Sequence, residues 1–152
     1  MEEQNKYYTP LITEFRVGFE YEYTYDGISD WTKGPNLDKD IPYNSIYQKR
    51  VKYLDRKDIE ELGFIYDNNT EPIPSRRDWE VPKLDKYELP LAFFKDTQLE
   101  DGKLYIIYLY SDNTIWIEYI KDCCGMDYIF KGIIKNKSEL KVLLLQLGIT
   151  TL

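Results

Sequence analysis

Histidine is absent from this chain of 152 residues. Because histidine is the commonest general base near neutral pH, its absence excludes catalytic triads built on an imidazole. A structural zinc site takes four cysteine or histidine ligands, and the only cysteines are Cys123 and Cys124. The sequence also contains neither a Walker A loop nor a GxGxxG motif. We therefore expect no catalytic residues, no metal and no cofactor, and an enzyme is the less favoured class.

The two cysteines are adjacent, and neighbouring residues of an extended chain point to opposite faces, which disfavours a disulfide between them. The first ten residues, "MEEQNKYYTP", contain acids and no apolar core of the kind a secretory signal has. No apolar run approaches the length of a membrane span. These features predict a cytoplasmic protein with no membrane association.

Alanine is also scarce, with Ala92 as its single occurrence, whereas tyrosine occurs 15 times. An AT-rich genome accounts for this bias, and aromatic platforms for bases or sugars are the alternative. The formal net charge of −7 opposes nucleic-acid binding. Acids alternate with lysine and arginine in stretches such as "DRKDIEE", which indicates a solubilising surface. The size and the 43% hydrophobic content predict a single domain over 1–152.

The stretch "EFRVGFEYEYTYDG" at 14–27 alternates aromatic or apolar residues with polar ones. This pattern predicts a long strand from Thr13 to Tyr25 with one buried aromatic face. Asp26-Gly27 then indicates a hairpin with a partner strand at about 28–33. "SIYQKRVKYL" at 45–54 predicts a third strand, with Tyr47, Val51 and Tyr53 on the face opposite Gln48, Arg50 and Lys52.

Two helices are predicted from capping signals. The first, at about 56–62, follows the candidate cap Asp55 and ends at Gly63, and a strand at 64–66 follows it. The second, at about 137–147, has Asn136 and Glu139 as a capping box and a leucine stripe that ends at Gly148. Between the helices, "KLYIIYLYS", "TIWIEYIK" and "DYIFKGII" predict three consecutive antiparallel strands.

These elements predict an α+β fold, a largely antiparallel twisted β-sheet with two helices. The stretches "VKYLDRKDIEELGF" and "IIKNKSELKVLLLQLGI" share the order strand, capped helix, Leu-Gly and apolar residue. The chain could thus consist of two similar strand-rich halves, although any glycine-capped β-to-α unit has this appearance.

Residues 67–90 contain four of the seven prolines and show neither helical nor strand periodicity, so we expect an irregular loop or insertion. Within it, Arg76, Arg77 and Trp79 are residue types that dominate binding hot spots. They are our candidate binding residues. The alternative is structural: Trp79 pins the loop to the core, and the arginines pair with nearby acids.

Two other groups of residues are weaker candidates. Glu20 and Glu22 lie on one face of the predicted strand, where a carboxylate pair could act in hydrolysis or hold a divalent metal; solvated glutamates on a strand are commoner. The basic run Lys49, Arg50, Lys52, Arg56 and Lys57 includes Tyr47 and Tyr53, but alternation puts those tyrosines on the face opposite Arg50 and Lys52. Cys123 and Cys124 are expected at a turn, without a neighbouring base to activate a thiol.

Three stretches, "EFRVGFEYE" at 14–22, "VKYLDRKDIEELGF" at 51–64 and "FKGIIKNKSELKVLLLQLGI" at 130–149, give the chain its resemblance to a known group. It resembles uncharacterised small proteins of phages, prophages and mobile elements of gut Bacteroidales. The resemblance covers most of the chain outside 67–90 and implies no activity or catalytic residues.

The first functional expectation is a small accessory protein that binds a host or viral protein through the Trp79 loop or an exposed sheet edge. The second is a protein that binds or sequesters a small ligand or nucleotide with tyrosine and arginine side chains, and the third is an enzyme that uses Glu20 and Glu22. A pocket lined by aromatic rings and arginine would favour the second expectation, whereas a flat surface with wet, unpaired glutamates would favour the first.

Overall fold

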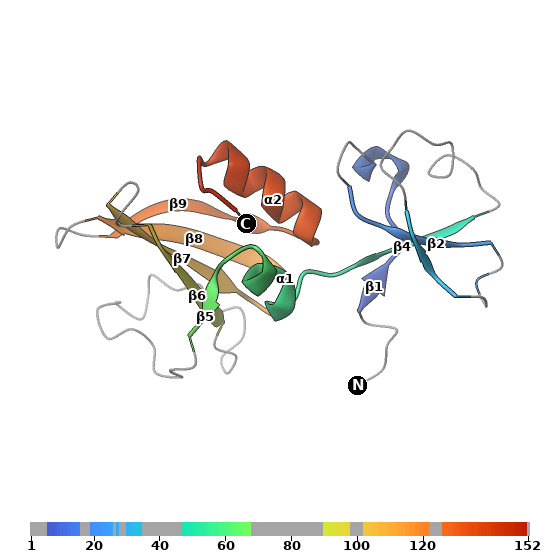
Figure 1. Cartoon of the computed structure of the whole chain (residues 1–152), viewed down its shortest axis with the longest axis horizontal. Helices are drawn as coiled ribbons and strands as arrows, with labels where there is room; N and C mark the ends of the chain where they lie inside the picture. The colour runs from blue at the N-terminus through green and yellow to red at the C-terminus, as the bar shows by residue number, and fades with distance from the viewer. Residues whose placement is uncertain are drawn as a thin grey trace. The chain divides into compact units, whose positions relative to one another are not determined.

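A computed structural model describes residues 6–15, 19–25, 27, 30–34, 47–67, 90–97, 102–121 and 126–151. It contains two antiparallel sheets and two α-helices, which confirms the predicted α+β class (Figure 1). The chain forms two compact units. The first combines Met1–Asp55 with Lys135–Thr151, and the second spans Arg56–Ile134 and includes Leu152. The expectation of a single domain over 1–152 stays a prediction.

The first unit contains a four-stranded antiparallel sheet in the order β1-β4-β2-β3. Its strands are β1 (Tyr7–Tyr8), β2 (Glu22–Thr24), β3 (Thr32–Lys33) and β4 (Gln48–Lys52). The pairing of β2 with β3 confirms the predicted partner strand, although β3 is shorter than predicted. Strand β4 confirms the third predicted strand, and its central position gives it neighbours on both sides.

The single long strand predicted from Thr13 to Tyr25 is wrong. A 3-10 helix, Ile12–Glu14, occupies its beginning, and only Glu22–Thr24 forms β2. Hydrogen bonds near the turn stabilise the 3-10 helix: the Glu14 N–H donates to the Leu11 carbonyl at 2.9 Å, and the Leu11 N–H donates to the Glu14 carboxylate at 2.6 Å. Such local side-chain bonds compete with strand pairing, and alternation alone does not reveal them.

The aromatic face predicted for that stretch nevertheless forms much of the core of the first unit. Phe19, Tyr21 and Val51 are buried together, and the partly buried rings of Tyr8, Phe15 and Tyr23 pack against them. Aromatic rings pack well in edge-to-face pairs, and Phe15 makes such pairs with both Phe19 and Tyr21. Tyr25, predicted on the buried face, is instead 67% exposed because it lies beyond the end of β2.

Helix α2 (Lys137–Gln146) also belongs to the first unit and confirms the most clearly predicted helix. The Asn136 side chain accepts a hydrogen bond from the Glu139 N–H at 3.0 Å, as a helix N-cap does. The Glu139 carboxylate accepts from the Lys135 N–H at 2.7 Å, one residue before the position that a standard capping box uses. Side chains of Leu140 and Leu144 are fully buried.

The C-terminus of α2 is a Schellman motif. The Gly148 N–H donates to the Leu145 carbonyl, and the Ile149 N–H donates to the Leu144 carbonyl. Gly148 has a φ of +72°, a conformation that glycine adopts without the steric cost of a Cβ atom. Helix α1 (Arg56–Glu61) ends in the same pattern at Gly63, so the two similar stretches of sequence have similar helix ends. A true duplication stays a prediction.

The second unit contains a five-stranded antiparallel sheet in the order β5-β6-β7-β8-β9, against which α1 packs at β5 and β6. Its strands are β5 (Ile65–Tyr66), β6 (Leu91–Asp96), β7 (Lys103–Leu109), β8 (Thr114–Lys121) and β9 (Met126–Ile133). Strands β7, β8 and β9 confirm the three strands predicted at the C-terminal end, and α1 and β5 are also where the sequence predicted them. Asp112 and Asn113 form the turn between β7 and β8, with φ of 64° at Asn113.

Both faces of this sheet contain buried side chains. One face carries Phe93, Ile107 and Ile117, which are opposite one another on neighbouring strands and fully buried. The other face carries Tyr108 and Glu118, whose hydroxyl and carboxylate form a buried hydrogen bond of 3.1 Å. A sheet buried on both faces lacks strict alternation of polar and apolar residues, which explains the continuous apolar run in β7.

Other predictions fall on residues that the structure does not describe. They concern Asp26 of the predicted hairpin, nearly all of the 67–90 loop with Arg76, Arg77 and Trp79, and the pair Cys123 and Cys124. Within the described ranges, neither helix has the length and apolar character that a membrane span requires.

Candidate functional site

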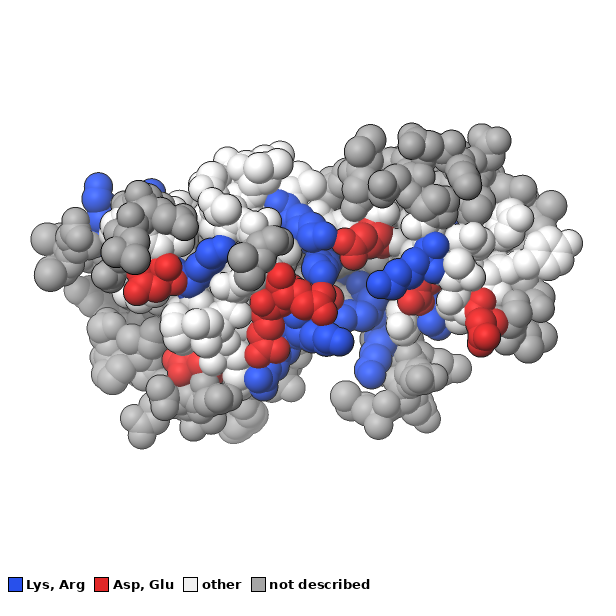
Figure 2. Space-filling model, in the orientation of Figure 1, with Lys and Arg blue, Asp and Glu red and all other residues white. Residues whose placement is uncertain are grey.

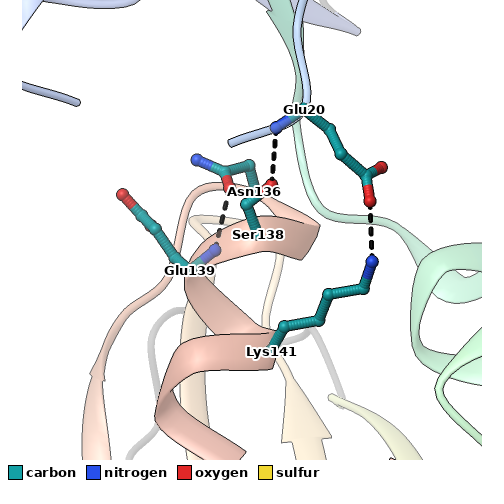
Figure 3. Close-up of polar contacts among 5 residues, drawn as sticks. All are labelled: Glu20, Asn136, Ser138, Glu139 and Lys141. Atoms are coloured by element: carbon teal, nitrogen blue, oxygen red, sulfur yellow. Dashed lines mark hydrogen bonds and ion pairs between the residues drawn. The ribbon is translucent and has the colours of Figure 1, made fainter. Parts of the chain in front are cut away.

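The two glutamates singled out from the sequence each have a cationic partner. The Glu20 carboxylate accepts from Lys141 Nζ of α2 at 2.7 Å, and the Glu20 N–H donates to the Ser138 hydroxyl at 2.9 Å (Figure 3). Glu20 therefore connects the segment before β2 to the first turns of α2. Figure 3 also shows Asn136 and Glu139 at the cap of the same helix.

Glu22 pairs with a different element. Its carboxylate accepts from Arg50 Nε at 2.7 Å, across the pairing of β2 with β4. The two glutamates thus have separate ion pairs in place of a shared site, so the unpaired glutamates expected beside a protein-binding surface are not found at these two positions. Among the described residues, no group of three or more cysteine, aspartate or glutamate side chains could hold a metal ion. This arrangement supports a structural role for both glutamates, and their use as a catalytic pair stays a prediction.

Arg50 is the centre of the most distinctive arrangement in the first unit. Its guanidinium carbon lies 3.8 Å from the centroid of the Tyr7 ring and 4.1 Å from the centroid of the Trp31 ring. Each contact is a cation–π interaction, which contributes about 0.5 to 1 kcal/mol at an exposed site and more where water is excluded. Together with the ion pair to Glu22, these rings hold the arginine in one orientation.

All four strands contribute to this arrangement. We define the Arg50 face as six residues that share it: Tyr7, Glu22, Trp31, Lys33, Arg50 and Lys52. Cross-strand pairing places Glu22 opposite Arg50 on one side and opposite Lys33 on the other, and it places Tyr7 opposite Lys52. Trp31 directly precedes β3. None of these side chains is fully buried.

The opposite side of the same sheet is the aromatic core. Tyr8 is opposite Val51, Tyr53 packs against Tyr8 at 4.8 Å between centroids, and Tyr47 packs edge to face on Tyr23. Alternation therefore separates Tyr47 and Tyr53 from Arg50, as the sequence predicts. The alternation of β4 did not predict that Tyr7 and Trp31 supply other aromatic rings to the charged side. The one local signal was that Tyr7 and Tyr8 are neighbours on a strand, so that Tyr7 points to the face opposite the buried face of Tyr8.

A second polar network lies at the junction of the chain ends within the first unit. The Tyr8 hydroxyl donates to Glu14 at 2.9 Å and accepts from the Asn136 amide at 2.8 Å. Burial and the Glu14 hydrogen bond both raise the pKa of Tyr8 above its ordinary value. The network joins β1, the 3-10 helix and the α2 cap. Its position therefore indicates that it stabilises the unit, and not that it binds a ligand.

The surface charges are mixed. Figure 2 shows acidic and basic side chains interleaved on the face in view, without a broad field of one sign among the described residues. Burial lowers the pKa of Lys49, which lies on the opposite side of β4 from Arg50. The Arg50 face is thus a local cluster of cations on a protein that is acidic overall.

Comparisons with protein families, with characterised proteins and with solved structures give no match for this chain.

Proposed function

We propose that this chain is a small non-enzymatic accessory protein, encoded by a phage or another mobile element, that binds another protein in the host cell cytoplasm. The resemblance to small proteins of phages and mobile elements supports the origin. One structural observation supports the binding role: Arg50 held between Tyr7 and Trp31 on a sheet face that remains partly exposed.

Tryptophan, tyrosine and arginine are the residues that contribute most to protein–protein hot spots. An arginine side chain that is fixed before binding avoids the entropy cost of being ordered at the interface, which is about 0.5 to 1.5 kcal/mol for a long side chain. The two rings and Glu22 already impose that order on Arg50. The Arg50 face therefore has both the composition and the preorganisation of an interaction surface.

The predicted loop surface at Arg76, Arg77 and Trp79 stays a second candidate for the same role. A small anionic ligand or nucleotide is the alternative function, and the same cluster of arginine and aromatic rings supports it. Protein binding is the better-supported function, because these residues lie across a sheet face, where a protein partner can cover several strands at once.

Affinity capture from the native host tests this proposal. The tagged wild-type chain, Arg50→Gln with Trp31→Ala, Arg76→Ala with Trp79→Ala, and the control Lys57→Gln are compared. Lys57 is an exposed cation of α1 whose ion pair with Glu61 measures 4.0 Å, and it is not one of the residues of the Arg50 face, so Lys57→Gln matches the charge change of Arg50→Gln. We expect the captured protein to be lost with the Arg50 and Trp31 variant and retained with Lys57→Gln.

The captured protein is then purified and its binding reconstituted with the same variants. Binding that is insensitive to both surface variants would exclude protein recognition through either surface. Co-purification of a small molecule that depends on Arg50, with no protein partner, would favour the alternative function.

A further inference from the structure

We infer that the Arg50 face recognises an acidic segment of its protein partner, with carboxylates that bind Arg50 and Lys33. This inference rests on the proposed function and names the chemistry of the partner. It follows from the hydrogen-bonding groups that the face offers.

Hydrogen-bond donors dominate the Arg50 face. Glu22 is the one acid among its residues, and its carboxylate receives Arg50 Nε. Lys52 pairs with Asp55 at 2.9 Å and is thereby neutralised. Within the described ranges, the two terminal nitrogens of Arg50 and the Nζ of Lys33 have no anionic partner. The face therefore has more positive charge than its own carboxylate can balance.

The geometry of Arg50 suits a carboxylate. A guanidinium binds a carboxylate through two parallel N–H···O bonds, which requires two neighbouring nitrogens in a fixed plane. Glu22 occupies Nε, while the edge formed by the terminal nitrogens has no described partner. Tyr7 and Trp31 both contact the guanidinium at about 4 Å. These contacts fix the plane of the guanidinium group before the partner binds.

Lys33 provides a second anchor. It lies on β3, and Arg50 lies on β4, with β2 between them. Two strand spacings of about 4.8 Å place the backbones of these two residues roughly 10 Å apart. An extended segment with acids a few residues apart covers that distance. Electrostatic complementarity of this kind contributes specificity and faster association.

A single-stranded nucleic acid fits this face less well. Base recognition requires open aromatic faces for stacking, and Arg50 covers one face of Tyr7 and one face of Trp31. A polyanion also experiences the net charge of −7 over its whole length. The experiment that follows therefore includes a single-stranded nucleic acid among its probes.

The test uses the full chain and three labelled probes: a peptide of alternating Glu and Gly, the same peptide with Gln in place of every Glu, and oligothymidine. Fluorescence anisotropy at low and raised ionic strength measures their binding to the wild type, Arg50→Gln, Arg50→Lys, Lys33→Gln and the control Lys57→Gln. Thermal unfolding of each variant confirms that it folds. Arg50→Lys keeps the positive charge and removes the planar guanidinium group, so it separates the effect of bidentate geometry on binding from the effect of charge.

We expect the Glu peptide to bind and the Gln peptide to fail. Arg50→Gln and Lys33→Gln should each weaken binding of the Glu peptide by about tenfold. Arg50→Lys should weaken it less than Arg50→Gln, and Lys57→Gln should have no effect. Equal binding of the two peptides, an equal loss with Lys57→Gln, or tighter binding of oligothymidine would each overturn the inference.

The two proposals fail separately. If the Glu peptide does not bind but the captured partner still depends on Arg50, the proposed function stands and the acidic segment is wrong. If the captured partner does not depend on Arg50, the role of this face in the proposed function is wrong.

Discussion

The side-chain amide of Asn136 donates a hydrogen bond of 2.8 Å to the Tyr8 hydroxyl, although 128 residues separate them along the chain. The same Asn136 side chain caps α2 through the Glu139 N–H. One buried residue thus holds the helix start and connects it to β1. The first unit depends on this connection because it is assembled from both ends of the chain.

Replacement of Asn136 should separate these two roles. Asn136→Ser keeps a side-chain oxygen for the cap and loses the amide group that donates to Tyr8, whereas Asn136→Ala loses both groups. Loss of a cap costs about 1 kcal/mol, and an unmade buried hydrogen bond costs about 1 to 3 kcal/mol. We expect Ala to reduce the free energy of unfolding more than Ser, as measured by urea denaturation. Equal losses would show that the cap contributes nothing.

Tyr8→Phe should show a stability difference that depends on pH. The pKa of Tyr8 is raised in the folded state above the ordinary value of 10.0, so the unfolded chain loses this proton first as the pH rises. The stabilisation is present below about pH 10 and decreases at higher pH. We expect Tyr8→Phe to cost about 1 to 3 kcal/mol near neutral pH and less in alkaline solution.

Urea midpoints across this pH range measure the effect against the wild type. The shifts at Tyr21 and Tyr119, which are also upward, are common to both proteins and cancel in the difference. Tyr25→Phe, on an exposed ring, is the control and should leave stability unchanged. A gap between Tyr8→Phe and the wild type that is constant with pH would contradict the prediction.

The contact between Arg50 and Trp31 should be measurable as a coupling energy. A double-mutant cycle with Arg50→Gln and Trp31→Ala should give about 0.5 to 1 kcal/mol in the free energy of unfolding. The control cycle pairs Arg50→Gln with Leu145→Ala, since Leu145 is 78% exposed on α2. That control should be additive. If the cycle of Arg50→Gln and Trp31→Ala were also additive, the contact between Arg50 and Trp31 would not stabilise the fold.

Gly148→Ala tests the end of α2. At φ of +72° an alanine is strained, although a Cβ atom at this position would meet no other atom within 4 Å. The cost is therefore conformational only, about 1 to 2 kcal/mol. Leu145→Ala, in the same turn but exposed, should change the melting temperature little. A neutral Gly148→Ala would indicate that the Schellman motif is dispensable.

The expectation of a single domain can be tested with one variant in each compact unit. Asn136→Ala lies in the first unit, and Ile107→Ala removes a fully buried side chain from the second, at a cost of about 2 to 5 kcal/mol. If the chain is one cooperative domain, both variants lower the midpoint of a single calorimetric transition. Two transitions, each sensitive to one variant, would show two independently unfolding domains.

Elements with local signals were predicted well. The turn at Asp112-Asn113, the Asn136 cap and the two glycine stops depend on residues within a few positions of one another, so the sequence alone reveals them. Strand β6 was not predicted. Its adjacent Phe93 and Phe94 break the alternation because the sheet of the second unit buries side chains on both faces.

The fold class, both helices with their ends, and the β7–β8–β9 meander could be predicted from local patterns, because these features depend on short-range periodicity and capping. The 3-10 helix at the start of the predicted first strand, and the position of Arg50 against the Tyr7 and Trp31 rings, could be found only in the folded chain. Those three residues come from different strands or their ends, at 43 and 19 positions from Arg50 along the chain. Strand order and register bring them together, and neither is encoded in the local pattern of any one segment.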